Sequence, residues 1–138
     1  MFALDGDFVR RLTRWAFQEG VVEAVAVVGS YANGSARPDS DLDVIILTAA
    51  APAFVSDTRW TRAFGHVTTI AIEHYAPVES VRVRYADHGE VEFGFAPPTW
   101  ADSETVDAGT AGVVADGMLI FVDKRGRLAK LSRAVLQK

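Results

Sequence analysis

Two carboxylates follow a glycine-serine bend within a short stretch of this chain. Residues 29–43 read Gly-Ser-Tyr-Ala-Asn-Gly-Ser-Ala-Arg-Pro-Asp-Ser-Asp-Leu-Asp, and an apolar run, residues 44–47, comes next. Asp41 and Asp43 are two residues apart, so at the start of a strand both side chains point to the same face. Neighbouring carboxylates repel one another unless a cation neutralises them. The pair therefore predicts a site for Mg²⁺, which prefers oxygen ligands and retains water and substrate phosphates in its shell.

The bend itself is suited to holding phosphate. Gly29 has no side chain, so the backbone can approach a phosphate closely. Ser30 supplies a hydroxyl at a predicted helix start, where free N–H groups attract anions. Gly34 permits another close approach, and Ser40 is expected to orient Asp41 or to contact a phosphate. We therefore predict nucleotide-binding residues at positions 29, 30, 34 and 40.

A predicted hairpin supplies further polar groups. Residues 81–85 and 91–95 both alternate with period two. A three-residue loop over residues 87–89 puts Gly89 at the left-handed position that such hairpins need. This register pairs Val83 with Phe93 on the apolar face and Arg84 with Glu92 on the polar face.

Phosphoryl transfer with two metal ions calls for a third carboxylate from a neighbouring strand. Glu92 fits best because it lies mid-strand on the polar face, and Glu90 on the same face is the alternative. Arg82 and Arg84 share that face. They would contact the triphosphate or the acceptor, or else form cross-strand ion pairs.

The surrounding pattern predicts an α/β (α+β) arrangement with a mixed sheet flanked by helices. The expected helices cover residues 5–19, 31–35 (capped by Ser30 and ended by Pro38), 51–64 and 127–137, with a short helix or loop at 107–115; the expected strands cover 21–28, 42–47, 67–75, the hairpin and 118–122.

Bulk properties limit the class of protein. A length of 138 residues predicts a single domain spanning residues 1–138. The net charge of −4 argues against an extended nucleic-acid-binding surface. The chain has no cysteine, so disulfides and thiolate metal sites are excluded. Apolar runs are too short to span a bilayer and the N-terminus lacks the regions of a signal peptide, so a cytoplasmic location is expected by default.

The segment from Gly29 to Asp43 resembles the nucleotidyltransferase superfamily that includes DNA polymerase β. The shared pattern is Gly-Ser, then Gly, then Asp-x-Asp, which stands here as Gly29-Ser30, Gly34 and Asp41-Leu42-Asp43 between apolar strands. The spacing is similar to that of minimal nucleotidyltransferases and of the catalytic domains of aminoglycoside and lincosamide nucleotidyltransferases. The resemblance implies a polymerase β-like fold.

The resemblance also implies an activity: transfer of a nucleoside monophosphate from a nucleoside triphosphate (NTP) to an acceptor hydroxyl, with release of pyrophosphate. The acceptor would be a small molecule or a protein side chain. Asp41 and Asp43 would ligate two Mg²⁺ or Mn²⁺ ions, and Glu92 would ligate one of them and help activate the hydroxyl. The chain departs from many relatives at Asn33, where they carry a basic residue. It also has little room beyond a catalytic core, so the acceptor site would be small, shared across a homodimer or supplied by a partner.

Two other functions are consistent with the same residues. Minimal nucleotidyltransferases resemble antitoxins whose partner is a helical HEPN-type ribonuclease, so the chain would be an interaction module. The second alternative is a catalytically inactive nucleotide-binding protein. A purely binding role predicts no dependence on Asp41 or Asp43, and an inactive sensor predicts triphosphate binding without pyrophosphate release.

Overall fold

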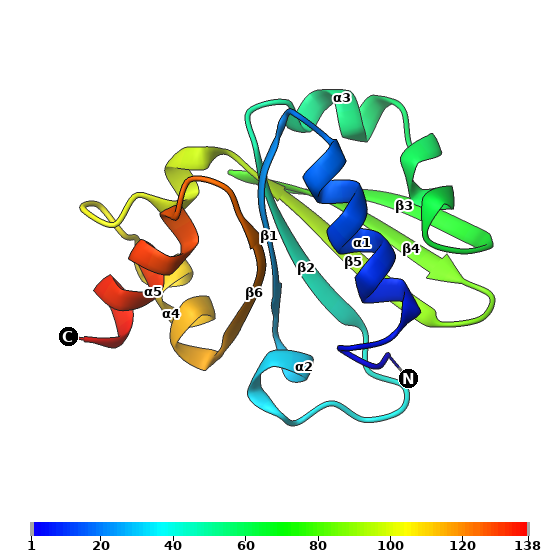
Figure 1. Cartoon of the computed structure of the whole chain (residues 1–138), viewed down its shortest axis with the longest axis horizontal. Coiled ribbons are helices and arrows are strands. Elements are labelled where there is room, and N and C mark those ends of the chain that lie inside the picture. The colour runs from blue at the N-terminus through cyan, green and yellow to red at the C-terminus, as the bar shows by residue number, and fades with distance from the viewer. Residues whose placement is uncertain (1, 138) are drawn as a thin grey trace.

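The computed structural model describes residues 2–137, which build a six-stranded sheet in the order β3-β4-β5-β2-β1-β6 (Figure 1). In chain order the elements are α1 (Asp7–Gln18), β1 (Val22–Val28), α2 (Ser30–Asn33), β2 (Leu42–Thr48), α3 (Ala51–Ser56), the 3-10 helix η1 (Arg59–Ala63), β3 (Val67–Tyr75), β4 (Val78–Tyr85), β5 (Gly89–Ala96), the 3-10 helix η2 (Pro98–Ala101), α4 (Ala108–Asp116), β6 (Met118–Asp123) and α5 (Arg127–Leu136). The sheet is mixed because β2 and β5 run parallel while the other paired strands are antiparallel.

Helices cover the two faces of the sheet unequally. On one face α1, α3 and η1 enclose a core rich in aromatic rings, in which Trp60 stands edge-on to Phe93 at 4.9 Å between ring centroids. On the other face α4, α5 and η2 cover the half of the sheet around β1, with Leu128 and Leu131 fully buried. Figure 1 shows α4 and α5 together on one side of the molecule, away from β3 and β4. Within residues 2–137, the face of β3 and β4 on the side of the sheet that carries α4 and α5 is therefore left without a covering helix.

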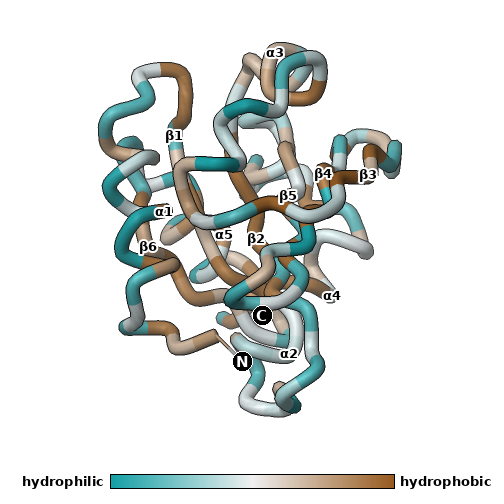
Figure 2. The backbone as a smooth tube through the Cα atoms, turned by 90° about the vertical axis from the view of Figure 1, so that its right-hand side faces the viewer, coloured by the Kyte–Doolittle hydropathy of each residue, from teal (hydrophilic) through white to brown (hydrophobic). Residues whose placement is uncertain are grey.

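The central strands form the interior of the molecule. Residues of β1, β2 and β5 are mostly buried, and Figure 2 shows hydrophobic residues along these strands. The predicted mixed sheet with flanking helices is confirmed, as are the strands expected at 21–28, 42–47, 67–75 and 118–122 to within a residue or two. The segment expected as a short helix or loop at 107–115 is helical, and the Asp107 carboxylate caps it by accepting from the Thr110 N–H at 2.8 Å.

The prediction of one helix over residues 51–64 is wrong in extent. The segment divides into α3 and η1 because Asp57 adopts extended backbone and its carboxylate binds both the N–H and the side chain of Arg59. The break lets the Trp60 indole donate to the carbonyl of Phe54 at 2.8 Å, which packs η1 onto the core.

The bend after β1 also differs from the prediction. Gly29, not Ser30, is the N-cap residue of α2, and no side chain caps that end. The helix has only four residues and ends at Gly34, which is left-handed with φ of 84°, well before Pro38. The short helix is thus set by two glycines with positive φ.

The predicted register of the hairpin is wrong by two residues. Val83 pairs with Val91, and Tyr85 pairs with Gly89 across a loop of residues 86–88. The predicted partner of Glu92 is therefore replaced: Arg82, not Arg84, lies opposite it. At the end of β4 the buried Tyr85 hydroxyl donates to the carbonyl of Thr61 at 2.7 Å, which holds this end of the strand against η1.

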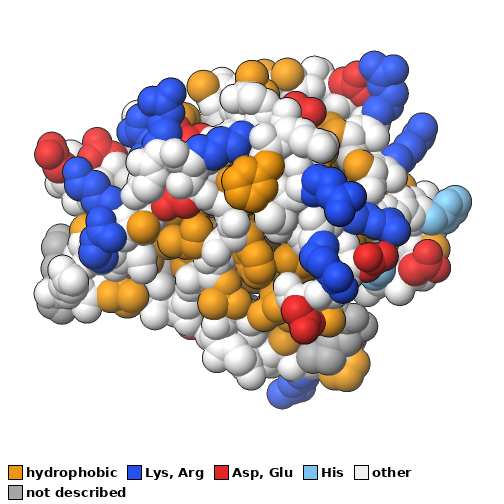
Figure 3. Space-filling model, viewed as in Figure 1, with side chains coloured by type: hydrophobic (Ala, Val, Ile, Leu, Met, Phe, Trp, Pro, Cys, Tyr) orange, Lys and Arg blue, Asp and Glu red, His pale blue; other side chains and the backbone are white. Residues whose placement is uncertain are grey.

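An apolar groove lies between α1 and β6. Figure 3 shows hydrophobic side chains gathered near the centre of the face that carries α1. The groove holds about 480 Å³ and is lined by Leu4, Val9, Arg10, Thr13, Arg14, Phe17, Gln18 and Phe121. The Phe17 side chain is 62% exposed, so the groove presents a large aromatic group to solvent.

Within residues 2–137, the helices are too short or too polar to cross a lipid bilayer.

Candidate active site

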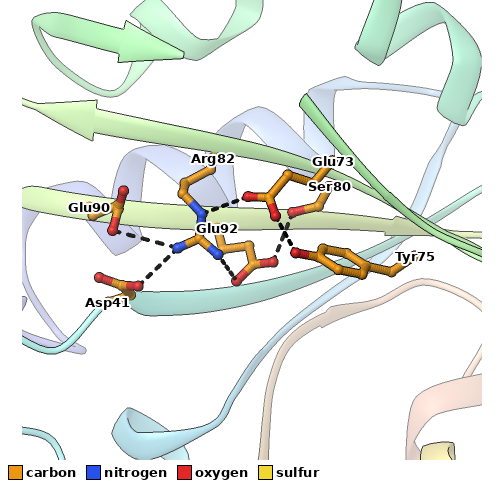
Figure 4. Close-up of polar contacts among 7 residues, drawn as sticks. All are labelled: Asp41, Glu73, Tyr75, Ser80, Arg82, Glu90 and Glu92. Carbon is orange, nitrogen blue, oxygen red and sulfur yellow. Dashed lines mark hydrogen bonds and ion pairs between the residues drawn. The ribbon is translucent and has the colours of Figure 1, made fainter. Parts of the chain in front are cut away.

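The parallel pairing of β2 with β5 brings the predicted acids together. Asp43 lies directly opposite Glu92 in this register. Asp41 is the residue just before β2, and Figure 4 shows its carboxylate pointing toward the Arg82 guanidinium, as do those of Glu90 and Glu92. The sequence placed these residues on separate strands, and the sheet joins them on the face that α4 and α5 leave partly open.

Arg82 of β4 stands among these acids. Its guanidinium lies 3.0 Å from Asp41 Oδ2 and 3.0 Å from Glu92 Oε2. It also lies 3.0 Å from Glu73 Oε1 and 3.5 Å from Glu90 Oε2. Figure 4 shows the side chain surrounded by the four carboxylates. The hydrogen bond to Glu73 and the nearby Glu92 and Glu90 raise the pKa of Arg82, so its positive charge is permanent.

Asp43 is the most perturbed acid of the group. Its burial, followed by the negative charges of Glu92 and Asp41, raises the pKa of the Asp43 carboxyl to about 6. This shift means that ionising Asp43 is costly in the protein as it stands. A cation bound between the carboxylates would offset that repulsion.

Gly29 adjoins Asp43 so closely that no side chain fits. A Cβ atom built on Gly29 would lie 2.4 Å from Asp43 Oδ2, and the residue has φ of 73°. Both the space and the backbone conformation therefore require glycine. The bend and the acid are thereby held as one structural unit.

The other predicted nucleotide-binding residues lie at the two ends of α2 and in the loop before β2. Ser30 is the first residue of α2. Gly34 ends α2 in open space, with no atom near the position of a Cβ, so its glycine serves helix termination. The Ser40 hydroxyl accepts from the Arg37 N–H at 2.8 Å and holds the loop before Asp41. Their contacts with a nucleotide remain predictions.

Asn33 has a structural role. Its amide donates to Asp116 Oδ2 at 2.9 Å and its carbonyl oxygen accepts from the Ser35 N–H at 2.9 Å. This links the end of α2 to the end of α4.

Arg84 lies farther from the acids than predicted. It is exposed and its Cα is opposite Glu90, and within residues 2–137 its side chain forms no hydrogen bond or ion pair. Glu90 approaches Asp41 and Arg82, and burial together with Asp41 raises the pKa of Glu90. The geometry favours Glu92 over Glu90 as the third carboxylate, because of the two only Glu92 lies opposite Asp43.

Two contributors to the group were missed from the sequence. Ser80 donates to Glu92 Oε1 at 2.9 Å. Glu73, which also accepts from the Tyr75 hydroxyl, binds Arg82 from β3. The sequence places Glu73 in a predicted strand, which is the one sign that it could reach a neighbouring strand. Only the pairing of β3 with β4 brings it to Arg82.

The oxygen donors of Asp41, Asp43 and Glu92 are those that Mg²⁺ or Mn²⁺ takes. In the described part of the chain, however, no three acidic or histidine side chains already surround a common point suited to a metal ion. Two of the three predicted ligands instead bind the Arg82 guanidinium. The donor chemistry fits a divalent cation, which would share Asp41 and Glu92 with Arg82 or displace it from them.

A small apolar pocket opens beside Asp43 and Glu92. It has a volume of about 210 Å³, and its walls include Val28, Val78, Trp100 and Val113. Val28 immediately precedes the glycine-serine bend. The pocket is therefore next to both the phosphate-binding bend and the acids.

Comparison with known proteins identifies the arrangement. A family model described as a nucleotidyltransferase domain matches residues 10–92, more than half of the chain, including the bend and all the predicted acids. The chain belongs to the nucleotidyltransferase domain family. This confirms the predicted family and, at the level of the family, the prediction of an enzyme that transfers nucleotidyl groups.

The fold of this nucleotidyltransferase domain is also found among solved structures. It is similar to the crystal structure of an aminoglycoside 6-adenyltransferase from Bacillus subtilis, with a TM-score of 0.56 and 11% sequence identity. The similarity covers 70% of this chain but 36% of the adenyltransferase, so the chain spans about a third of that protein. No curated protein sequence matches this chain.

Proposed function

We propose that this nucleotidyltransferase domain transfers a nucleoside monophosphate from an NTP to an acceptor hydroxyl, in a reaction that depends on Mg²⁺ or Mn²⁺. The observation that carries the proposal is Asp43 opposite Glu92 and against Gly29. Family membership supports the same class of reaction.

Each group has a role in this reaction. The N–H groups of the Gly29-Ser30 bend and the Ser30 hydroxyl bind the triphosphate. Asp41, Asp43 and Glu92 are the proposed ligands of the divalent cation, which when bound supplies positive charge next to the phosphate oxygens. The acceptor oxygen attacks the α-phosphorus, the bond to the β-phosphate oxygen breaks, and pyrophosphate leaves with the electron pair. Glu92 is the proposed acceptor of the hydroxyl proton.

The apolar pocket beside the acids suits an uncharged part of a substrate. Its walls combine aliphatic side chains with Trp100, and Asp43 and Glu92 lie at its polar end. We propose that it receives the nucleoside or the apolar body of the acceptor, because desolvation of such groups favours binding.

The test is transfer of label from each α-³²P NTP with Mg²⁺ or Mn²⁺, with and without candidate acceptors, together with release of pyrophosphate. Asp43→Asn is expected to lower the rate by at least about 100-fold, a loss of about 2.7 kcal/mol of transition-state stabilisation. The matched control is Asp39→Asn, which removes the same charge from an exposed position. Equal rates for wild type and Asp43→Asn would refute the mechanism. Triphosphate binding without pyrophosphate release from wild type would favour the inactive nucleotide-binding alternative.

The groove between α1 and β6 favours a second function, docking of a helical protein partner such as the HEPN-type toxin or a second copy of the chain. Its apolar floor and the two arginines at positions 10 and 14 would receive an acidic amphipathic helix. Phe17→Glu is expected to abolish a complex formed on co-expression with the product of an adjacent gene, while Asp43→Asn leaves it intact. A complex unaffected by Phe17→Glu would contradict use of this groove.

A further inference from the structure

The Arg82 guanidinium binds two of the three proposed metal ligands, Asp41 and Glu92. Its Nε donates to Glu73, its Nη1 to Asp41 and its Nη2 to Glu92, each at 3.0 Å. Arginine presents its N–H groups in a rigid fork that matches carboxylates. All three nitrogen atoms are therefore engaged, and the side chain is fixed by several bonds at once (Figure 4).

Limited exposure strengthens these contacts. The Arg82 side chain is 26% exposed, and the contacting carboxylates lie between 23% and 36%. Charge pairs of this kind are screened less than pairs in open solvent. Four carboxylates and one guanidinium leave three uncompensated negative charges when all are ionised. The cluster thus holds Arg82 firmly and still attracts further cations.

The four carboxylates have two different relationships to the proposed metal site. Asp41 and Glu92 are proposed ligands, whereas Glu73 and Glu90 are not. Both oxygens of Glu92 are occupied, Oε1 by the Ser80 hydroxyl and Oε2 by Arg82. A metal ion at these oxygens would compete with Arg82 for Asp41 and Glu92, whereas the contacts of Arg82 with Glu73 and Glu90 can persist.

We propose that Arg82 is an internal counter-ion that positions Asp41 and Glu92 in the metal-free protein and competes with the divalent cation for them. This inference rests on the proposed function for the identity of the metal ligands. Its consequence is that a cation binds more weakly than the carboxylates alone would allow. Arg82 is a positioning residue, because it acts on the substrate through the acids.

The test measures cation binding directly, without turnover. The affinity of the protein for Mn²⁺ alone is measured at pH 8 by electron paramagnetic resonance of free Mn²⁺, and thermal unfolding is followed with and without Mn²⁺. Arg82→Gln is expected to bind Mn²⁺ at least about ten-fold more tightly than wild type. Without metal the variant is expected to unfold at a lower temperature than wild type, and added Mn²⁺ is expected to raise its unfolding temperature by more. The matched control, Arg84→Gln, lies two residues along the same strand, is exposed, and is expected to leave all three measurements unchanged.

Arg82→Lys provides a second variant if Arg82→Gln fails to fold. Lysine keeps the charge but loses the fork, so its Mn²⁺ affinity is expected to lie between those of wild type and Arg82→Gln. Unchanged or weaker Mn²⁺ binding in the folded Arg82 variants, or no Mn²⁺ binding by any variant, would overturn the inference. The proposed function fails separately, if wild type binds Mn²⁺ but transfers no label; tighter binding by Arg82→Gln would then still support the competition.

Discussion

Gly29 and Asp43 share a space that admits no additional atom: a Cβ on Gly29 would lie 2.4 Å from Asp43 Oδ2. The bend between β1 and α2 and the acid on β2 are coupled by this contact, because β1 and β2 are paired and Val28 lies opposite Asp43. A side chain added at Gly29 would therefore displace the Asp43 carboxylate.

Gly29→Ala is the direct test of that coupling. Alanine is strained at φ of 73° and would collide with the Asp43 carboxylate, so we expect a loss of about 2–3 kcal/mol in the free energy of unfolding. Gly34→Ala is the control, because it has a similar φ of 84° but open space around it, and a loss of about 1 kcal/mol is expected. Urea unfolding measures both. Equal losses would mean that the steric contact contributes nothing.

Asp43 gives the protein a specific pH dependence of stability. Its pKa is about 6 in the folded protein and 3.8 in an unfolded chain. Between these values the unfolded chain releases the proton while the folded protein retains it, so ionisation of Asp43 progressively lowers stability as pH rises from about 4 to 6, and the loss is complete above 6.

Asp43→Asn removes this effect. We expect the variant to match wild type near pH 3.5 and to be more stable by about 1 kcal/mol at pH 8, a modest gain because solvent screens a partly exposed group. Thermal or urea unfolding across this range in metal-free buffer provides the measurement. A variant less stable than wild type at pH 8 would contradict the raised pKa.

The third carboxylate of the proposed metal site can be identified by comparing two glutamate-to-glutamine variants. Glu92→Gln is expected to reduce nucleotidyl transfer by at least about 100-fold, because Glu92 is opposite Asp43. Glu90→Gln, two residues away on the same face, is expected to lower it by less than about ten-fold. Single-turnover assays at saturating Mg²⁺ measure both, and a larger defect in Glu90→Gln would transfer the role to Glu90.

Narrowing the apolar pocket tests its use by a substrate. Val113 lies on α4, is 38% exposed and lines the pocket, so Val113→Trp can reach into it without disturbing the core. We expect the KM for the substrate that enters the pocket to rise about ten-fold, a change of about 1.4 kcal/mol in binding, with Mn²⁺ affinity unchanged. Unchanged KM values for both NTP and acceptor would exclude this pocket from substrate binding.

Several features of the fold follow from local patterns. Phe8, Leu12 and Ala16 are buried at helical spacing in α1, and the β-branched run of β1 is buried as expected. The pair of acids rests on the same local reasoning: a two-residue spacing at a strand start predicts Asp41 and Asp43 on one face. These predictions depend only on residues near one another in the sequence.

The break between α3 and η1 has a different origin. The pattern of residues 51–64 suits one helix, but the Asp57 carboxylate competes for the Arg59 N–H. Asp side chains often offer the backbone such an alternative. Which partner prevails depends on whether Trp60 can pack against the core, and its contact with Phe93 on a distant strand provides that packing.

The chain's own sequence determined the glycine-serine bend, the paired aspartates and the family to which they belong. Only the tertiary structure decided that Arg82 stands among the acids in place of Arg84. A shift of two residues keeps every side chain of a strand on its face, so the alternation of polar and apolar residues cannot tell the two registers apart. The contacts that accompany the observed register, from Arg82 to Glu73, Asp41 and Glu92, join residues that only the folded protein brings together.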